Sequence, residues 1–165
     1  MKQRTLWLCV GIPGSGKSYW VSKHKKDGVW VSRDAIRFCL VDEGEAYFSK
    51  EKEVYDTFVK GVQKMIDWSD ADVYADATHL NWPSRRKLLN RLNTSNIRVG
   101  CLVFRTPLDM CLARNNLRSG REKVPEDVIR NMYRSMTHPV SDPYNYDVIK
   151  DVFPSGDTVE VGGKE

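Results

Sequence analysis

Gly11-Ile12-Pro13-Gly14-Ser15-Gly16-Lys17-Ser18 is the stretch of the sequence that decides the predicted fold. It follows Thr5–Val10, an apolar run that predicts a buried strand, and it opens a predicted helix from Lys17 to about Lys26. The stretch matches the pattern G-x-x-x-x-G-K-[ST] in the strand–loop–helix context that this pattern requires. Its glycines allow backbone N–H groups to approach phosphate oxygens at a helix N-terminus. A nucleoside triphosphate is therefore the expected ligand.

The positions of this loop have separate expected roles in binding ATP and Mg²⁺. Lys17 should reach the β- and γ-phosphates, and the Ser18 hydroxyl should be a ligand of Mg²⁺. The alternative is a glycine-rich turn with an incidental lysine, which average residue usage makes rare. We assign ATP binding to Gly11, Pro13, Gly14, Ser15, Gly16, Lys17 and Ser18, with Arg114 as a further contact.

Predicted strands and helices alternate along the rest of the chain. Further strands are expected at 29–31, 71–75 and 97–104, and weaker ones near Val148 and Val159. Helices are expected after Ser49, which we predict to be a helix cap, and after Pro83, Pro107 and Pro125. Such alternation predicts an α/β fold: a central parallel sheet of four to five strands with helices on both faces. One domain over residues 1–165 accounts for the sequence, with a helical lid over about 114–136.

Composition narrows the class of protein. The chain has 165 residues, of which 41% are hydrophobic, so a real core is expected. Its apolar runs are too short for a membrane span or a signal peptide, and we expect a cytoplasmic protein without a membrane partner. The net charge of +4 suits a phosphate-rich partner without deciding for one. The spacing of the cysteines predicts buried free thiols at Cys9, Cys39, Cys101 and Cys111, and the three histidines are too scattered for a metal cluster.

Asp76 bears on the choice between a kinase and an ATP-hydrolysing motor. It ends a predicted strand, where the acid on the magnesium side is expected, and Ala77 follows it. A motor usually has a glutamate at that next position to activate water. Its absence favours transfer of phosphate to a bound hydroxyl. The alternative is that Asp76 only caps the following turn.

Asp34 is the expected general base for such a transfer. A kinase needs a carboxylate that accepts the proton of the acceptor hydroxyl, and ligands of parallel sheets gather at the carboxyl ends of the strands, where Asp34 lies. Arg37 is three residues on, so it shares a helix face with Asp34 and could hold a phosphate of the acceptor. The alternative is that Asp34 only caps a short helix. We expect Arg33 to be solvated.

Arg114 and Arg118 are the expected cations of the lid. They are one turn apart on one predicted helix, within a stretch from Arg105 to Arg134 that is locally basic. A lid that closes excludes water and strengthens their attraction to phosphate. The alternative is a solvated basic face.

Taken together, these strings resemble the 5′-kinase domain of phage-type polynucleotide kinase/phosphatases, within the small P-loop kinases. The resemblance spans residues 4–137, and its strings are Gly11–Ser18, Ser32-Arg33-Asp34 with Arg37, Asp76–Asn81 ahead of Arg85-Arg86, and Arg114–Arg118 followed by Val124-Pro125 and Met132–Met136. It implies the P-loop kinase fold and the use of ATP and Mg²⁺ to phosphorylate 5′-OH ends of DNA or RNA. It also implies catalytic roles for Lys17, Asp34 and Arg118, and substrate-binding roles for Arg37, Asp76 and Thr78. A D-x-D-G-T phosphatase string is absent, so 3′-end repair is not expected from this chain.

Two other functions remain open from the sequence. One is a kinase for a small acceptor, such as a nucleoside, a sugar or an aminoacylated-tRNA terminus; the other is a non-catalytic nucleotide switch. A nucleic-acid acceptor would need aromatic faces for stacking. Candidates for that role, each of which could instead be core, are Trp20, Trp30, Tyr47 and Trp82. DNA or RNA, single or double strand, and the oligomeric state stay open.

Overall fold

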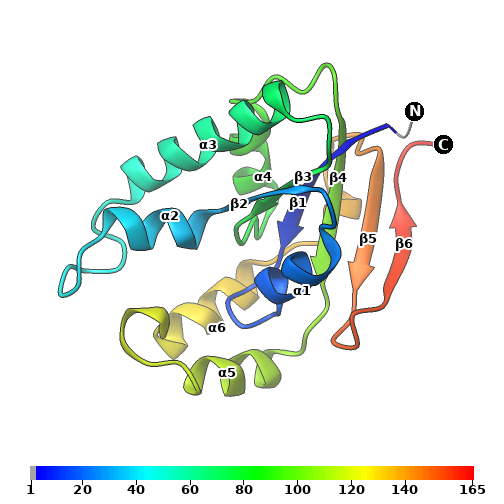
Figure 1. The fold of residues 1–165 in the computed structure, drawn as a ribbon. Coiled ribbons are helices and arrows are strands. Elements are labelled where there is room, and N and C mark those ends of the chain that lie inside the picture. The colour runs from blue at the N-terminus through cyan, green and yellow to red at the C-terminus, as the bar shows by residue number, and fades with distance from the viewer. Residues whose placement is uncertain (1–2) are drawn as a thin grey trace.

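A computed structural model describes residues 3–165, which form one twisted sheet with helices around it (Figure 1). The strands are β1 (Thr5–Val10), β2 (Val29–Ser32), β3 (Val73–Asp76), β4 (Arg98–Phe104), β5 (Val148–Val152) and β6 (Thr158–Gly162). The helices are α1 (Lys17–His24), α2 (Arg33–Leu40), α3 (Glu51–Trp68), α4 (Trp82–Leu89), α5 (Leu108–Asn116) and α6 (Glu126–Ser135), with 3₁₀ turns at Gly120–Glu122 and Pro139–Ser141.

The sheet has the order β2-β3-β1-β4-β5-β6. The first five of these strands are parallel, and β6 pairs with β5 in the antiparallel direction. This confirms the predicted parallel sheet and adds an edge strand to it. Because parallel strands end at the same edge, the residues after β1, β2, β3, β4 and β5 all meet there.

Helices cover both faces of the sheet, as predicted. On one face, Leu6, Leu8 and Val10 of β1 pack with apolar side chains of α3 and α4. On the other face, Trp7 and Cys9 belong to the cluster that includes Val21 of α1. The alternate residues of β1 therefore face opposite layers, which explains why the whole strand is buried.

A third apolar cluster packs helices α5 and α6 beyond the carboxyl edge of the sheet. It joins Ile12 of the phosphate loop to side chains of α5 and α6, including Cys111, Leu112 and Ile129. Figure 1 shows these two helices below the sheet, next to the end of β1. The helices α5 and α6, at the two ends of the predicted lid, therefore pack directly on the phosphate loop.

Two local predictions were wrong. Ser49 does not cap α3, because the N-cap position is Lys50 and no side chain caps it. Cys39 is exposed, whereas Cys9, Cys101 and Cys111 are buried free thiols as predicted. Cys39 lies near the end of α2 on its outer side, a position that the apolar pattern alone did not identify. Across residues 3–165, no helix combines the length and apolar character that crossing a membrane requires.

Candidate active site

The loop between β1 and α1 has the geometry of an anion-binding nest. Gly14 and Gly16 have φ angles of +82° and +92°, which favour glycine. A Cβ at Gly14 would also lie 2.6 Å from the carbonyl oxygen of Cys111, so no side chain fits there. Helix α1 begins directly after Gly16, and its first turn holds no acidic residue. Its free N–H groups and the positive end of its dipole are therefore available to an anion.

Lys17 lies over this loop. Its Nζ donates to the carbonyl oxygens of Gly11 and Ile12, at 2.8 and 3.1 Å. Burial lowers the pKa of Lys17, while the charges of Asp76 and Asp34 oppose that shift. The ammonium is thus short of solvation in a place where phosphate oxygens would compensate its charge. Gly11 itself lies beneath the loop, where its N–H donates to the carbonyl oxygen of Thr78 at 3.0 Å.

Ser18 and Asp76 form the pair of oxygen groups that suits Mg²⁺. The Ser18 hydroxyl donates to Oδ2 of Asp76 at 2.7 Å, and Nε1 of Trp30 donates to the same oxygen at 3.0 Å. Mg²⁺ prefers one or two protein oxygens together with waters and phosphate oxygens, and this pair fits that donor set. Among residues 3–165 no cluster of three or more His, Cys, Asp or Glu offers an all-protein metal site instead.

Asp34 lies at the start of α2. It lines a cavity that the phosphate loop and Ser18 also line. Ser32 is the N-cap of α2, since its hydroxyl accepts from the N–H of Ala35 at 3.2 Å, so Asp34 is free of that role. The Asp34 carboxylate is 61% exposed. It accepts from Arg37, and from the hydroxyl of Tyr47 at 2.8 Å. The carboxylate is therefore oriented by two donors, and the side chain stays accessible where it lines the cavity.

Glu51 is a member of this site that the sequence did not reveal. Its two carboxylate oxygens accept from Arg33 and from Arg37, each at 2.8 Å, and it lines the cavity from the first turn of α3. The expectation that Arg33 is solvated was wrong, because Arg33 is half-buried in the ion pair with Glu51 and its guanidinium carbon lies 5.1 Å from the Tyr55 ring centre. The signal in the sequence was an acid in a helix first turn, which helix capping explains equally well.

One cavity of about 840 Å³ joins the phosphate loop and Asp34 to an aromatic wall. At the wall, Trp20 stacks on His24 with ring centres 4.3 Å apart, and its Nε1 donates to the Gly156 carbonyl at 3.1 Å. The turn between β5 and β6, with Phe153 and Pro154, completes this side. The predicted residues that line the cavity together are Pro13, Gly14, Ser15, Gly16, Lys17, Ser18, Asp34, Arg37, Asp76, Thr78, Arg114 and Arg118.

The lid contacts the phosphate loop and α2. Arg114 donates from Nη1 to the Gly14 carbonyl at 3.1 Å, whereas Arg118 is exposed at the cavity rim. Asn115 closes the base of the lid loop through two bonds with the backbone of Val124, at 2.7 and 3.0 Å. From the 3₁₀ turn, Arg121 donates to backbone carbonyls at the end of α2. The lid therefore spans from the phosphate loop to the helix that carries Asp34.

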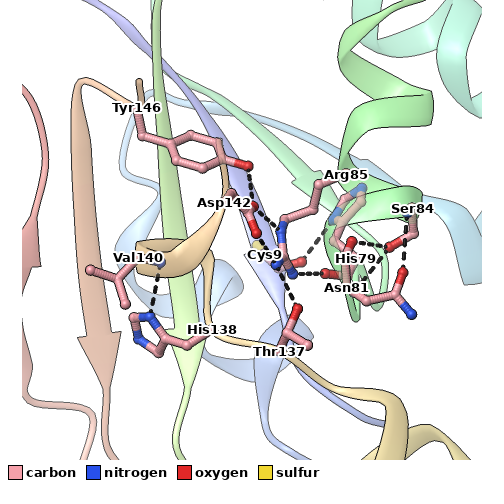
Figure 2. Close-up of polar contacts among 10 residues, drawn as sticks. All are labelled: Cys9, His79, Asn81, Ser84, Arg85, Thr137, His138, Val140, Asp142 and Tyr146. Carbon is pink, nitrogen blue, oxygen red and sulfur yellow. Dashed lines mark hydrogen bonds and ion pairs between the residues drawn. The ribbon is translucent and has the colours of Figure 1, made fainter. Parts of the chain in front are cut away.

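Figure 2 shows a network of buried polar contacts around Arg85. Arg85 of α4 is fully buried and pairs with Asp142 through Nε and Nη2, at 2.7 and 2.8 Å. Its Nη1 donates to the His79 carbonyl at 2.7 Å. His79 bonds through Nδ1 to the Cys9 carbonyl at 2.7 Å, and burial lowers the pKa of this histidine to about 4. The network thus fixes the segment that carries Thr78 against the end of β1.

The comparison with protein families identifies the domain. The AAA_33 family model, described as an AAA domain, matches residues 6–139. The chain belongs to this family. The AAA_33 match begins in β1 and ends at the 3₁₀ turn after α6, so it includes the phosphate loop, Asp34, Asp76 and the lid.

The sequence of this AAA_33 domain is also similar to that of a curated kinase. L-seryl-tRNA(Sec) kinase of Methanococcus maripaludis is 25% identical over 146 residues, which are 81% of this chain and 53% of that protein. The chain therefore spans about half the length of that curated relative. This similarity supports a phosphotransferase and does not specify its acceptor.

Solved structures of other proteins share the fold, and two of them show its range. One is a chain of the Pnkp1/Rnl/Hen1 RNA repair complex, with a TM-score of 0.68 and 17% identity, covering 100% of this chain and 50% of that one. The other is a gluconokinase from Sinorhizobium meliloti 1021, with a TM-score of 0.58 and 14% identity, covering 92% and 84%. The predicted α/β P-loop kinase fold and its resemblance to polynucleotide kinase domains are confirmed.

Proposed function

We propose that this domain is an ATP- and Mg²⁺-dependent kinase of polynucleotide 5′-hydroxyl ends. The observation that carries the proposal is the placement of Asp34 in the same cavity as the phosphate loop, beside two arginines, Arg33 and Arg37. A kinase requires a donor site, a base for the acceptor hydroxyl and cations near the acceptor. All three are available in one cavity here, and the resemblance of the sequence supports a nucleic-acid end as the acceptor.

In this proposal the residues divide into a donor side and an acceptor side. The loop N–H groups and Lys17 hold the β- and γ-phosphates of ATP, and Ser18 with Asp76 holds the metal. Mg²⁺ supplies charge neutralisation on the phosphate oxygens when bound. The acceptor 5′-oxygen forms the new bond to the γ-phosphorus while the bond to the β–γ bridging oxygen breaks. Asp34 takes the proton of the hydroxyl, and ADP leaves.

The arginines stabilise negative charge at different places in this proposal. Arg114 and Arg118 lie on the lid side of the phosphate loop, where the migrating phosphoryl group carries its charge. Arg37 is held by Asp34 and Glu51, so its guanidinium is oriented but largely neutralised. Arg33 shares Glu51 as its ion-pair partner and also lines the cavity, which makes it a second cation for a phosphate of the acceptor strand.

A panel of acceptors tests this function. Purified protein is incubated with γ-labelled ATP, Mg²⁺ and 5′-OH oligonucleotides of DNA or RNA, a nucleoside, its 3′-phosphate, gluconate or L-seryl-tRNA. We expect an oligonucleotide to be the best acceptor and a nucleoside 3′-phosphate to exceed the free nucleoside. Gluconate or L-seryl-tRNA as the best acceptor would refute a polynucleotide kinase.

The second candidate is a kinase for an aminoacylated-tRNA terminus. The observation that favours it is the similarity to L-seryl-tRNA(Sec) kinase over 81% of this chain. The same Asp34 would then accept the proton of a seryl hydroxyl. The acceptor panel separates the two candidates, because a seryl-tRNA kinase would leave 5′-OH oligonucleotides unlabelled.

A further inference from the structure

Phe48 is an exposed aromatic ring at the acceptor end of the cavity. It lies in the segment between α2 and α3, lines the cavity with Asp34 and Arg37, and is 45% exposed. The charged side chains around it are Arg33, Asp34, Arg37 and Glu51. Phe48 itself offers only an apolar face. A large apolar surface left open inside a charged site points to a ligand with a matching apolar face.

Tyr47 fixes the position of this ring relative to the general base. The Tyr47 and Phe48 ring centres are 4.6 Å apart, with planes at 83°. Tyr47 also donates its hydroxyl to Asp34 at 2.8 Å, and the Arg37 guanidinium carbon lies 4.4 Å from its ring centre. Because Tyr47 contacts both Asp34 and Phe48, the Phe48 ring lies on the same side of the cavity as the general base.

Phe38 supports the pair from the other side. Its ring centre is 6.3 Å from that of Tyr47, and the guanidinium carbon of Arg121 lies 4.9 Å from the Phe38 ring centre. Tyr47 is thus surrounded by Arg37, Phe38 and Phe48. This packing limits the motion of Tyr47 and leaves Phe48 as the ring whose surface is most open to a ligand.

We propose that Phe48, supported by Tyr47, is the surface on which the 5′-terminal base of the acceptor stacks. This inference rests on the proposed polynucleotide kinase activity. It identifies the Phe48 ring as the group that makes the enzyme prefer an acceptor with a 5′-terminal base. A base has an apolar π-face, and stacking on an aromatic side chain tolerates any of the four bases. A sugar acid needs hydrogen-bonding groups around its hydroxyls, which Phe48 does not supply. The acceptor is accordingly an end with an unpaired terminal base.

The test compares two oligonucleotides that differ only at the first residue. One has a normal 5′-terminal nucleotide; the other has an abasic tetrahydrofuran residue with the same 5′-hydroxyl and 3′-phosphodiester. For the wild-type protein we expect kcat/KM to be about tenfold higher with the base present, since stacking is worth roughly 5- to 150-fold per base. Phe48→Ala and Phe48→Leu should remove that difference, Phe48→Trp should retain it, and none should change KM for ATP.

Trp68→Ala is the matched control, because Trp68 is 79% exposed at the end of α3 and lies outside the cavity lining. It should leave the ratio between the two oligonucleotides unchanged. The inference is overturned, with the proposed function intact, if the wild-type protein phosphorylates both oligonucleotides equally. It is also overturned if Phe48→Ala slows both equally, because Phe48 would then only support Asp34. If the wild-type protein labels no oligonucleotide but labels a sugar, the proposed function fails first.

Discussion

At the scale of single residues, Arg85 is a charged side chain that is fully buried in the protein. Its partner Asp142 is 2% exposed, and Tyr146 donates its hydroxyl to the same carboxylate at 2.8 Å. Burial and the Asp142 charge raise the pKa of Tyr146, so its hydroxyl stays a donor. Every nitrogen of the guanidinium has an acceptor, a condition for a buried ion pair to be tolerated.

Arg85→Met should destabilise the protein strongly. The substitution leaves the Asp142 carboxylate buried without its partner, which costs about 3–5 kcal/mol. Urea unfolding measures the free energy of unfolding of each variant. Arg86→Met is the control, because Arg86 is exposed on the same helix and its loss should change stability by less than about 0.5 kcal/mol.

A double variant distinguishes the buried charge from lost packing. Arg85→Met with Asp142→Leu removes both charges and should recover much of the stability lost in Arg85→Met. Equal stability of Arg85→Met and the wild-type protein would show that this network does not hold the segment around His79 in place.

At the scale of elements, the lid is tied to α2 by Arg121. Cationic groups near a helix C-terminus bind its last carbonyls and oppose the negative end of the dipole. Here the cation comes from the lid, so the contact connects the 3₁₀ turn Gly120–Glu122 to the helix that carries Asp34. Ordering of the lid and ordering of the acceptor site are therefore coupled through one side chain.

Arg121→Ala should loosen the lid without unfolding the domain. We expect faster amide hydrogen exchange over residues 117–123, and an increase of about three- to tenfold in KM for the acceptor if the contact is worth ~1 kcal/mol, typical of one hydrogen-bonding side chain. Lys123→Ala is the control, because Lys123 is exposed in the same segment. Unchanged exchange in Arg121→Ala would show that the lid is held by Asn115 and the apolar cluster alone.

At the scale of the whole molecule, the sequence predicted those features of the fold that depend on residues close together in the chain. The phosphate loop, the five parallel strands and the helices on both faces follow from local patterns, and the structure confirms them. The order of the strands and the antiparallel addition of β6 depend on which segments meet in space, and no local pattern specified them.

The same distinction applies to the site. Lys17, Ser18 and Asp34 stand in recognisable strings, so their positions were predicted. Glu51 lies 14 residues from Arg37, and Asp142 lies 57 residues from Arg85, so these partners became visible only in the fold. The cap of α2 is a third case. The sequence left open that Asp34 caps this helix, but the cap is Ser32, two residues earlier.

The central claim is that Asp34 accepts the proton when the γ-phosphate moves to a 5′-hydroxyl. The most direct measurement is the rate of label transfer from γ-labelled ATP to a 5′-OH oligonucleotide by the wild-type protein and by Asp34→Asn, with ATP affinity measured in parallel. Loss of a general base lowers the rate by roughly 10²–10⁴-fold. The account predicts transfer by the wild-type protein, a loss of that size in Asp34→Asn and unchanged ATP affinity. Near wild-type transfer by Asp34→Asn, or no transfer to a 5′-OH end by the wild-type protein, would contradict it.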